Sequence, residues 1–102
     1  MVTGYSIQFN EGAVADLKGV RVYDRRRIVD AIAEHLTLRP LHESRRRKAL
    51  VGLVPPWEQV RPVWQLRVGD YRVFYDVDEA ARTVIVQAVR RKRATGTTED
   101  SL

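Results

Sequence analysis

The sequence predicts an α+β fold in which an antiparallel β-meander packs against two N-terminal helices. Strand-like runs close the chain, an apolar stripe of helical spacing precedes them, and turn residues separate the runs. A chain of 102 residues with 44% hydrophobic content can bury one modest core. We therefore expect a single domain over residues 1–93 and a polar, flexible tail over residues 94–102.

The N-terminal segment is predicted to form a strand followed by a short helix. Tyr, Ile and Phe alternate with polar residues over positions 5–9, which is the pattern of a half-buried strand. Asn10 can cap a helix over residues 11–18, because its side-chain oxygen can accept a hydrogen bond from the first helical turn. Gly19 can end that helix.

A longer helix follows, and Asp24 is its predicted N-cap. Pro40 stops it, because proline lacks the backbone N–H that a helix uses. Apolar residues at helical spacing give this helix one face for the core: Ile28, Ile32 and Leu36. Residues 41–62 combine a basic run with prolines, so we expect them to form a loop that lies over the sheet.

Residues 63–68, 71–77 and 83–89 are predicted to form the meander. If Gly69-Asp70 is a two-residue hairpin turn, the register of the first two strands follows. The facing pairs are then Val68 with Tyr71, Arg67 with Arg72, Leu66 with Val73, Gln65 with Phe74, and Trp64 with Tyr75. One face carries the apolar residues Trp64, Leu66, Val68, Tyr71, Val73 and Tyr75. The other face, expected to be open, carries Gln65, Arg67, Arg72, Phe74 and Asp76.

On the open face Arg67 and Arg72 stand directly opposite each other, where like charges repel by roughly a few tenths of a kcal/mol. A phosphate between them would turn that repulsion into binding. The third strand leads into the cations of residues 90–93, which would leave the sheet beside this pair. The alternative is that an acidic neighbour neutralises the pair: Asp70, Asp76 or Glu79.

Composition limits the possible partners and compartments. The formal net charge is +5, and the cations are mostly arginines, whose planar fork suits phosphate, so RNA is the first candidate partner. An acidic protein, or solubility alone, is the alternative. With no cysteine and two histidines we expect no metal site and no disulfide. No signal-like or membrane-spanning run is evident, so we expect a cytoplasmic protein without membrane contact.

Residues 64–78 read Trp-Gln-Leu-Arg-Val-Gly-Asp-Tyr-Arg-Val-Phe-Tyr-Asp-Val-Asp, and a β-branched run and a basic cluster follow. This segment resembles the signature of the RelE/ParE family, the toxins of type II toxin–antitoxin systems. The resemblance extends over about residues 5–93 and includes a Leu-x-Gly element at residues 50–52. It implies a RelE-like fold, no cofactor and a cognate antitoxin protein as a partner.

Two activities are associated with this family's scaffold, so the fold does not decide between them. RelE-like members are ribosome-dependent mRNA endoribonucleases that need no metal and inhibit translation. ParE-like members are non-enzymatic inhibitors of DNA gyrase. We favour the first activity, with the ribosome and mRNA as partners. The alternatives are gyrase inhibition and a catalytically degenerate module that binds RNA or antitoxin.

The resemblance assigns roles to the basic residues. Arg72 matches the family arginine that stabilises the extra negative charge of the phosphorane. A second group of candidate catalytic cations ends the last strand: Arg91, Lys92 and Arg93. Arg47 and Lys48 match positions where related toxins carry RNA-contacting or catalytic residues. The full set of candidates for RNA binding is Arg45, Arg46, Arg47, Lys48, Arg67 and Arg90.

The sequence also departs from the family pattern. Val63 and Gln65 stand where the RelE prototype carries lysines on the first meander strand, and the C-terminal catalytic tyrosine is absent. The general base is therefore open. His42 and Glu43 are either proton-transfer groups or simply exposed loop residues. Trp57 either stacks on an RNA base or packs over the sheet.

Overall fold

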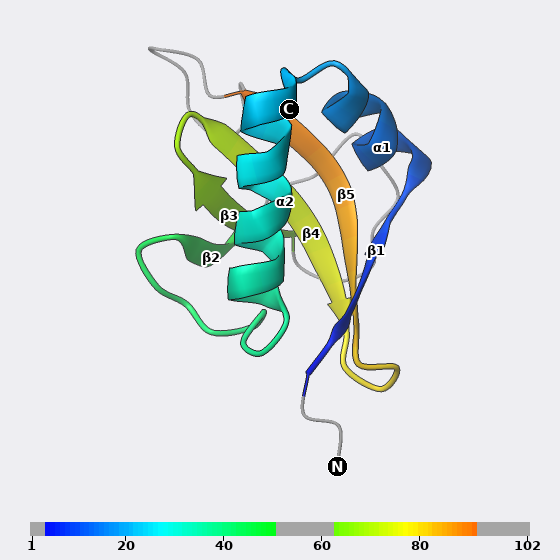
Figure 1. Cartoon of the computed structure of the whole chain (residues 1–102). Coiled ribbons are helices and arrows are strands. Elements are labelled where there is room, and N and C mark those ends of the chain that lie inside the picture. The colour runs from blue at the N-terminus through cyan, green and yellow to red at the C-terminus, as the bar shows by residue number, and fades with distance from the viewer. Residues whose placement is uncertain (1–3, 51–62, 92–102) are drawn as a thin grey trace.

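The computed structural model describes residues 4–50 and 63–91, which form one sheet with two helices (Figure 1). Along the chain the elements are β1 (Ser6–Phe9), α1 (Glu11–Lys18), α2 (Val22–Leu36), β2 (Arg47–Leu50), β3 (Val63–Val68), β4 (Tyr71–Asp78) and β5 (Thr83–Arg91). The strand order across the sheet is β1-β5-β4-β3-β2. The predicted α+β architecture, with N-terminal helices and an antiparallel meander, is confirmed.

The hairpin between β3 and β4 has the predicted register. Its facing pairs run from Val68 with Tyr71 to Trp64 with Tyr75. Gly69 adopts a φ of +57°, which glycine tolerates and other residues rarely adopt. The turn chemistry of Gly69-Asp70 therefore fixed which side chains share each face of the sheet.

β1 pairs in parallel with the first half of β5, and α1 covers the edge of the second half. The Asn10 side chain caps α1 by accepting from the Ala13 N–H at 2.8 Å, as predicted. The Asp16 carboxylate accepts from the Val89 N–H at 2.9 Å. Helix α1 thus satisfies part of a strand edge that β1 does not reach.

The core lies between α2 and the sheet. The predicted stripe of α2 is buried against β-strand residues of the face that the hairpin register assigned to the core. Tyr75 is fully buried, donates its hydroxyl to the Pro40 carbonyl, and stacks on Trp64 with ring centroids 6.2 Å apart. The buried hydrophobic side chains of α2 and of this sheet face are Ile28, Ile32, Leu36, Leu66, Val68, Val73, Tyr75, Val77, Val84, Val86 and Val89.

Three expectations need correction. Asp24 is not the N-cap of α2, because the helix begins at Val22 and Arg21 occupies the cap. Residues 41–62 are not all loop, since residues 47–50 pair with β3 as an edge strand. The face expected to be open is mostly buried: Gln65, Arg72, Phe74 and Asp76 are at most 8% exposed.

Other expectations lie outside the described residues. These are the course of residues 51–62, the tail after residue 93 and the environment of Trp57. Within residues 4–50 and 63–91, no helix has the length and apolar character needed to cross a membrane.

Candidate nucleic-acid interface

A row of arginines crosses one end of the sheet. The register pairs Arg67 of β3 with Arg72 of β4, and Arg72 with Arg90 of β5. Next to β2, the Arg46 carbonyl accepts from the Arg67 N–H at 2.7 Å. Because residues paired across antiparallel strands share a face, Arg67, Arg72 and Arg90 all project from the face opposite α2. The sheet therefore concentrates positive charge near the Gly69-Asp70 turn.

Arg72 occupies the centre of this row and is only 5% exposed. Its guanidinium donates to the Tyr71 carbonyl at 3.0 Å and to the Gly69 carbonyl at 3.4 Å. Burial lowers the pKa of Arg72, the charge of Arg67 lowers it further, and the charge of Asp70 opposes both effects. Arginine nevertheless keeps its proton at neutral pH, so Arg72 is a buried, oriented cation within the row.

Arg90 is neutralised by a residue that the sequence did not single out. Asp16 of α1 forms an ion pair and hydrogen bond with the Arg90 guanidinium, and the two residues are 74 positions apart. The acidic neighbours considered from the sequence all follow β3, whereas this partner comes from the first helix. Its position follows from α1 packing on the β5 edge.

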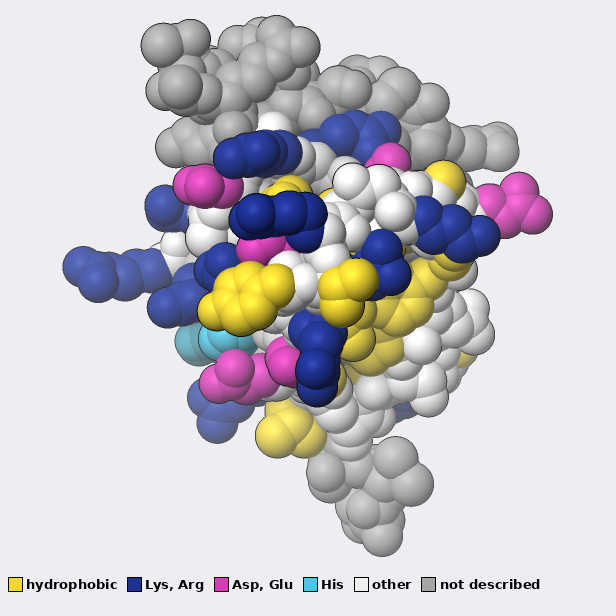
Figure 2. Space-filling model, turned by 45° about the horizontal axis from the view of Figure 1, so that its top comes forward, with side chains coloured by type: hydrophobic (Ala, Val, Ile, Leu, Met, Phe, Trp, Pro, Cys, Tyr) yellow, Lys and Arg dark blue, Asp and Glu magenta, His cyan; other side chains and the backbone are white. Residues whose placement is uncertain are grey.

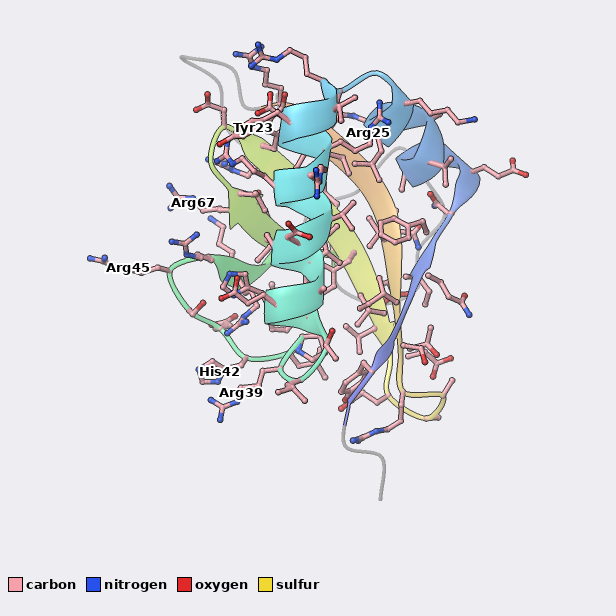
Figure 3. The ribbon with its side chains drawn as sticks, in the orientation of Figure 1. Tyr23, Arg25, Arg39, His42, Arg45 and Arg67 are labelled. Atoms are coloured by element: carbon pink, nitrogen blue, oxygen red, sulfur yellow. The ribbon has the colours of Figure 1, made fainter. Side chains whose placement is uncertain are left out.

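Beside the arginine row lies an open hollow of about 560 Å³. Its described lining consists of Arg45, Arg46, Arg67 and Gly69. All four residues are exposed, and Figure 3 shows Arg45 and Arg67 on the same side of the molecule. We call this hollow the arginine pocket. Its guanidinium groups suit a phosphate, because their paired N–H groups match two phosphate oxygens.

The two remaining candidates on β2 differ from each other. Arg47 is buried and donates to the His42 carbonyl at 2.9 Å and to the His35 carbonyl at 2.8 Å. It holds the loop after α2 against the helix end and satisfies carbonyls there. Lys48 is exposed and pairs with Gln65, so it lies on the same face as Arg72.

The candidate cations that end β5 fall into separate positions. Arg91 is exposed and pairs with Tyr71, whose side chain packs on the α2 side of the sheet. Arg91 therefore projects from the opposite face to Arg72, and Arg90 is the cation beside Arg72. Lys92 and Arg93 lie outside the described residues.

The structure brings Arg27 of α2 to the turn that borders the arginine pocket. A Cβ atom at Gly69 would lie 2.8 Å from Arg27 Nη2. Arg27 Nη1 is 3.6 Å from the Asp24 carboxylate, which also accepts from the Tyr71 hydroxyl at 3.2 Å. The three-residue spacing of Asp24 and Arg27 on a helix could have indicated the ion pair, but nothing local indicated its contact with the turn.

Groups that titrate near neutral pH are absent from the described lining of the arginine pocket. His42 and Glu43 are exposed in the loop before β2, and neither lines the pocket in the described part of the chain. Nor do residues 4–50 and 63–91 contain a cluster of three or more His, Cys, Asp or Glu side chains suited to a metal. The described pocket can bind and polarise an anion.

The family description "ParE toxin of type II toxin-antitoxin system, parDE" matches residues 7–95 of the sequence. The chain belongs to this toxin family. The match covers the sheet, both helices and the arginine row, so it confirms the resemblance to RelE/ParE toxins over nearly the same residues. No match was found among curated protein sequences.

Solved toxin structures share the fold of this ParE-family chain. The toxin–antitoxin complex RelBE2 from Mycobacterium tuberculosis contains a chain similar at 23% identity and a TM-score of 0.71, covering 90% of this chain and 95% of that one. A chain of the archaeal RelE–RelB complex from Pyrococcus horikoshii is 20% identical, with a TM-score of 0.63 and coverage of 94% and 100%. The isolated E. coli RelE toxin is 17% identical, with a TM-score of 0.61 and coverage of 89% and 87%. At these identities the likeness establishes the fold.

Proposed function

We propose that this toxin is a ribosome-dependent mRNA endoribonuclease that inhibits translation. The observation that carries the proposal is the arginine pocket beside the arginine row. Arg45, Arg46 and Arg67 surround an open space large enough for a phosphodiester, and Arg72 lies next to Arg67 in register. Such a concentration of arginines on one face suits an RNA backbone.

The arginines can supply most of what metal-independent RNA cleavage needs. Attack by a 2′-hydroxyl produces a phosphorane with additional negative charge, and fixed guanidinium groups stabilise that charge. Arg72 is already oriented by two backbone carbonyls, so little reorganisation is needed when the charge develops. The proton-transfer group in this proposal comes from the mRNA, the ribosome or residues beyond the described pocket lining.

A cognate antitoxin is the second partner that we propose. Two of the similar structures are complexes of RelE-type toxins with their antitoxins. An antitoxin that carries acidic residues can neutralise the exposed cations of the arginine pocket and so exclude RNA from it. We place the active, antitoxin-free toxin in the cytoplasm, where mRNA and ribosomes are.

A second candidate function has a specific observation in its favour. The described pocket lining contains arginines and a glycine, with no side chain suited to move protons at neutral pH. A toxin that only binds needs none, so this lining also fits a non-enzymatic inhibitor of DNA gyrase. A degenerate module that binds RNA or antitoxin without toxicity is consistent with the same lining.

Cleavage mapping in a reconstituted translation system tests the proposal. Antitoxin-free toxin is added to programmed ribosomes, and mRNA ends are mapped by primer extension. We expect cuts at A-site codons with wild type, and a loss of at least about tenfold with Arg67→Ala, whose exposed side chain lines the pocket. Arg26→Ala is the matched control, because it removes the same charge from an exposed site on α2 outside the described lining.

A second variant tests the catalytic role of Arg72. Arg72→Lys keeps the charge but loses the planar fork, so we expect slower cleavage in single-turnover conditions with unchanged ribosome binding. Intact mRNA together with inhibited gyrase supercoiling would move the assignment to gyrase. Intact mRNA with neither translation nor supercoiling affected rejects both toxic activities and leaves the binding module.

A further inference from the structure

Tyr23 is an exposed aromatic residue on the side of α2 that faces the arginine pocket. It is 72% exposed and lies in the first turn of the helix. Figure 3 shows Tyr23 on the same side of the molecule as Arg67 and Arg45, with Arg25 on the other side of α2. Figure 2 shows a face of the molecule on which hydrophobic side chains lie among Lys and Arg side chains, with acidic side chains nearby. An aromatic ring in such surroundings offers a flat, exposed stacking surface.

Arg27 lies one helical turn after Tyr23, so the two side chains occupy the same face of α2. The Arg27 side chain is 48% exposed, its Nη1 forms an ion pair with Asp24 at 3.6 Å, and its Nη2 lies close to the Gly69 turn. Asp24 is itself held by the Tyr71 hydroxyl. Because a guanidinium has five N–H groups, these contacts leave Arg27 donors for a ligand.

Gly69 connects Arg27 with the arginine pocket. Gly69 lines the pocket, and its missing side chain lets the Arg27 guanidinium approach the turn. The cationic surface therefore continues from Arg67 over the β3–β4 turn to Arg27 and ends at the ring of Tyr23. Along this surface, guanidinium groups suited to phosphate are thus followed by an exposed aromatic ring.

We propose that Tyr23 and Arg27 form a binding site for single-stranded RNA that leaves the arginine pocket. Tyr23 stacks on an unpaired base, and Arg27 binds the neighbouring phosphate, oriented by Asp24. Only an unpaired strand presents a base face to a surface ring, which excludes duplex RNA. The ligand class rests on the proposed function, but binding at this site does not require cleavage.

Direct binding of an uncleavable RNA tests the site. The probe is a fluorescein-labelled single-stranded RNA with 2′-O-methyl groups, and fluorescence anisotropy is measured with full-length, antitoxin-free toxin at several salt concentrations. We expect Tyr23→Ala to weaken binding by roughly fivefold to a hundredfold, as for loss of one stacked base. Tyr23→Phe keeps the ring and should bind as wild type does.

Arg27→Gln tests the phosphate contact. We expect it to lower the slope of log affinity against log salt by about 0.7, the value for one phosphate of a single strand. Arg26→Gln removes an exposed charge from the same helix and should leave the slope unchanged. Thermal unfolding of each variant verifies that these exposed substitutions keep the fold.

The outcomes separate this site from the ribonuclease proposal. Weaker RNA binding by Tyr23→Ala and Arg27→Gln supports the site, even if wild type cuts no mRNA in translation. Unchanged binding by both variants, with weaker binding by Arg67→Ala, overturns the site and leaves the arginine pocket as the RNA contact. Wild type that does not bind the probe, with Tyr23→Ala weakening only a complex with an antitoxin protein, also overturns it.

Discussion

The two ends of the β3–β4–β5 meander differ in charge and in what their charged side chains contact. Around the Gly69 turn, the arginine row meets an open pocket whose arginines are exposed. At the other end, carboxylates accept hydrogen bonds from nearby backbone groups: Asp78 from the Ala81 N–H of the β4–β5 turn at 3.1 Å, and Asp76 from the Val77 N–H within β4 at 2.8 Å. Acidic side chains build local structure at one end, whereas cations at the other end border space for a ligand.

This difference shows why the net charge of the toxin understates the positive potential at one end of its surface. A formal charge of +5 is modest, but Arg45, Arg46 and Arg67 line one open hollow at the Gly69 end, and this clustering raises the positive potential there although Asp70 is nearby. A polyanion would therefore be steered to one end of the sheet.

Reversing one charge at each end should have unequal effects on RNA binding. We expect Arg67→Glu to weaken binding of single-stranded RNA by about 1.5 to 3 kcal/mol, because a charge-assisted contact is replaced by repulsion. Arg82→Glu makes the same charge change at the acidic end, where Arg82 lies 4.9 Å from the Tyr5 ring. Fluorescence anisotropy should show at most a small change there. Equal losses for both variants would mean that only total charge matters.

Alanine substitutions at two glycines should have opposite effects on stability, because one glycine lies in a turn with positive φ and the other in an ordinary helix. Gly69→Ala should lower the free energy of unfolding by roughly 1 to 2 kcal/mol, because its φ of +57° disfavours a side chain, and the new Cβ would meet Arg27. Gly12→Ala is the control in α1, where the added Cβ lies 3.4 Å from its nearest neighbour. It should stabilise by roughly 0.5 to 1 kcal/mol. Urea unfolding measures both, and a neutral Gly69→Ala would contradict the strain.

Tyr75 lies between the two ends, and its titration predicts an alkaline loss of stability. Tyr75→Phe should cost about 1 kcal/mol at neutral pH, since the Pro40 carbonyl loses its donor. Burial raises the pKa of Tyr75, so the folded state retains this proton more strongly than the unfolded state. Wild type should therefore lose stability as pH rises above about 10, the ordinary tyrosine pKa.

The Phe variant lacks this contribution, so the stability difference between the two proteins should shrink from pH 8 to pH 11. Urea unfolding across that range, about one unit at a time, measures the difference. A constant difference would mean that Tyr75 ionises equally well in both states.

The smallest effect is expected at the acidic end. Asp78→Ala removes the acceptor for the Ala81 N–H and should cost roughly 0.5 to 1 kcal/mol of unfolding free energy. RNA affinity should stay within about twofold, because the residue lies far along β4 from the arginine row. Glu79→Ala is the control for loss of a neighbouring exposed carboxylate. A large gain in RNA affinity for Asp78→Ala would show that the acidic end repels the ligand.

The local sequence was enough to predict the elements other than β2, and the pairing within the hairpin. Gly69-Asp70 set the register of β3 and β4, and the spacing of Ile28, Ile32 and Leu36 set the buried face of α2. Both features depend on residues close together in the chain, whose periodicity and turn chemistry act directly on the backbone. The row of Arg67 and Arg72 followed from the same register.

Tertiary structure decided how that row is used. Tertiary packing buries Arg72 on a face that the alternation of residues alone predicted to be open. The same packing brings Asp16 to Arg90, which is 74 residues away in the chain. It also set Arg27 against the Gly69 turn. Burial and ion pairing depend on which surfaces meet after the chain folds, and contacts between distant residues leave no period in the sequence. Local patterns thus set where the cations lie on their strands, and packing between distant segments set which of them became buried, paired or exposed.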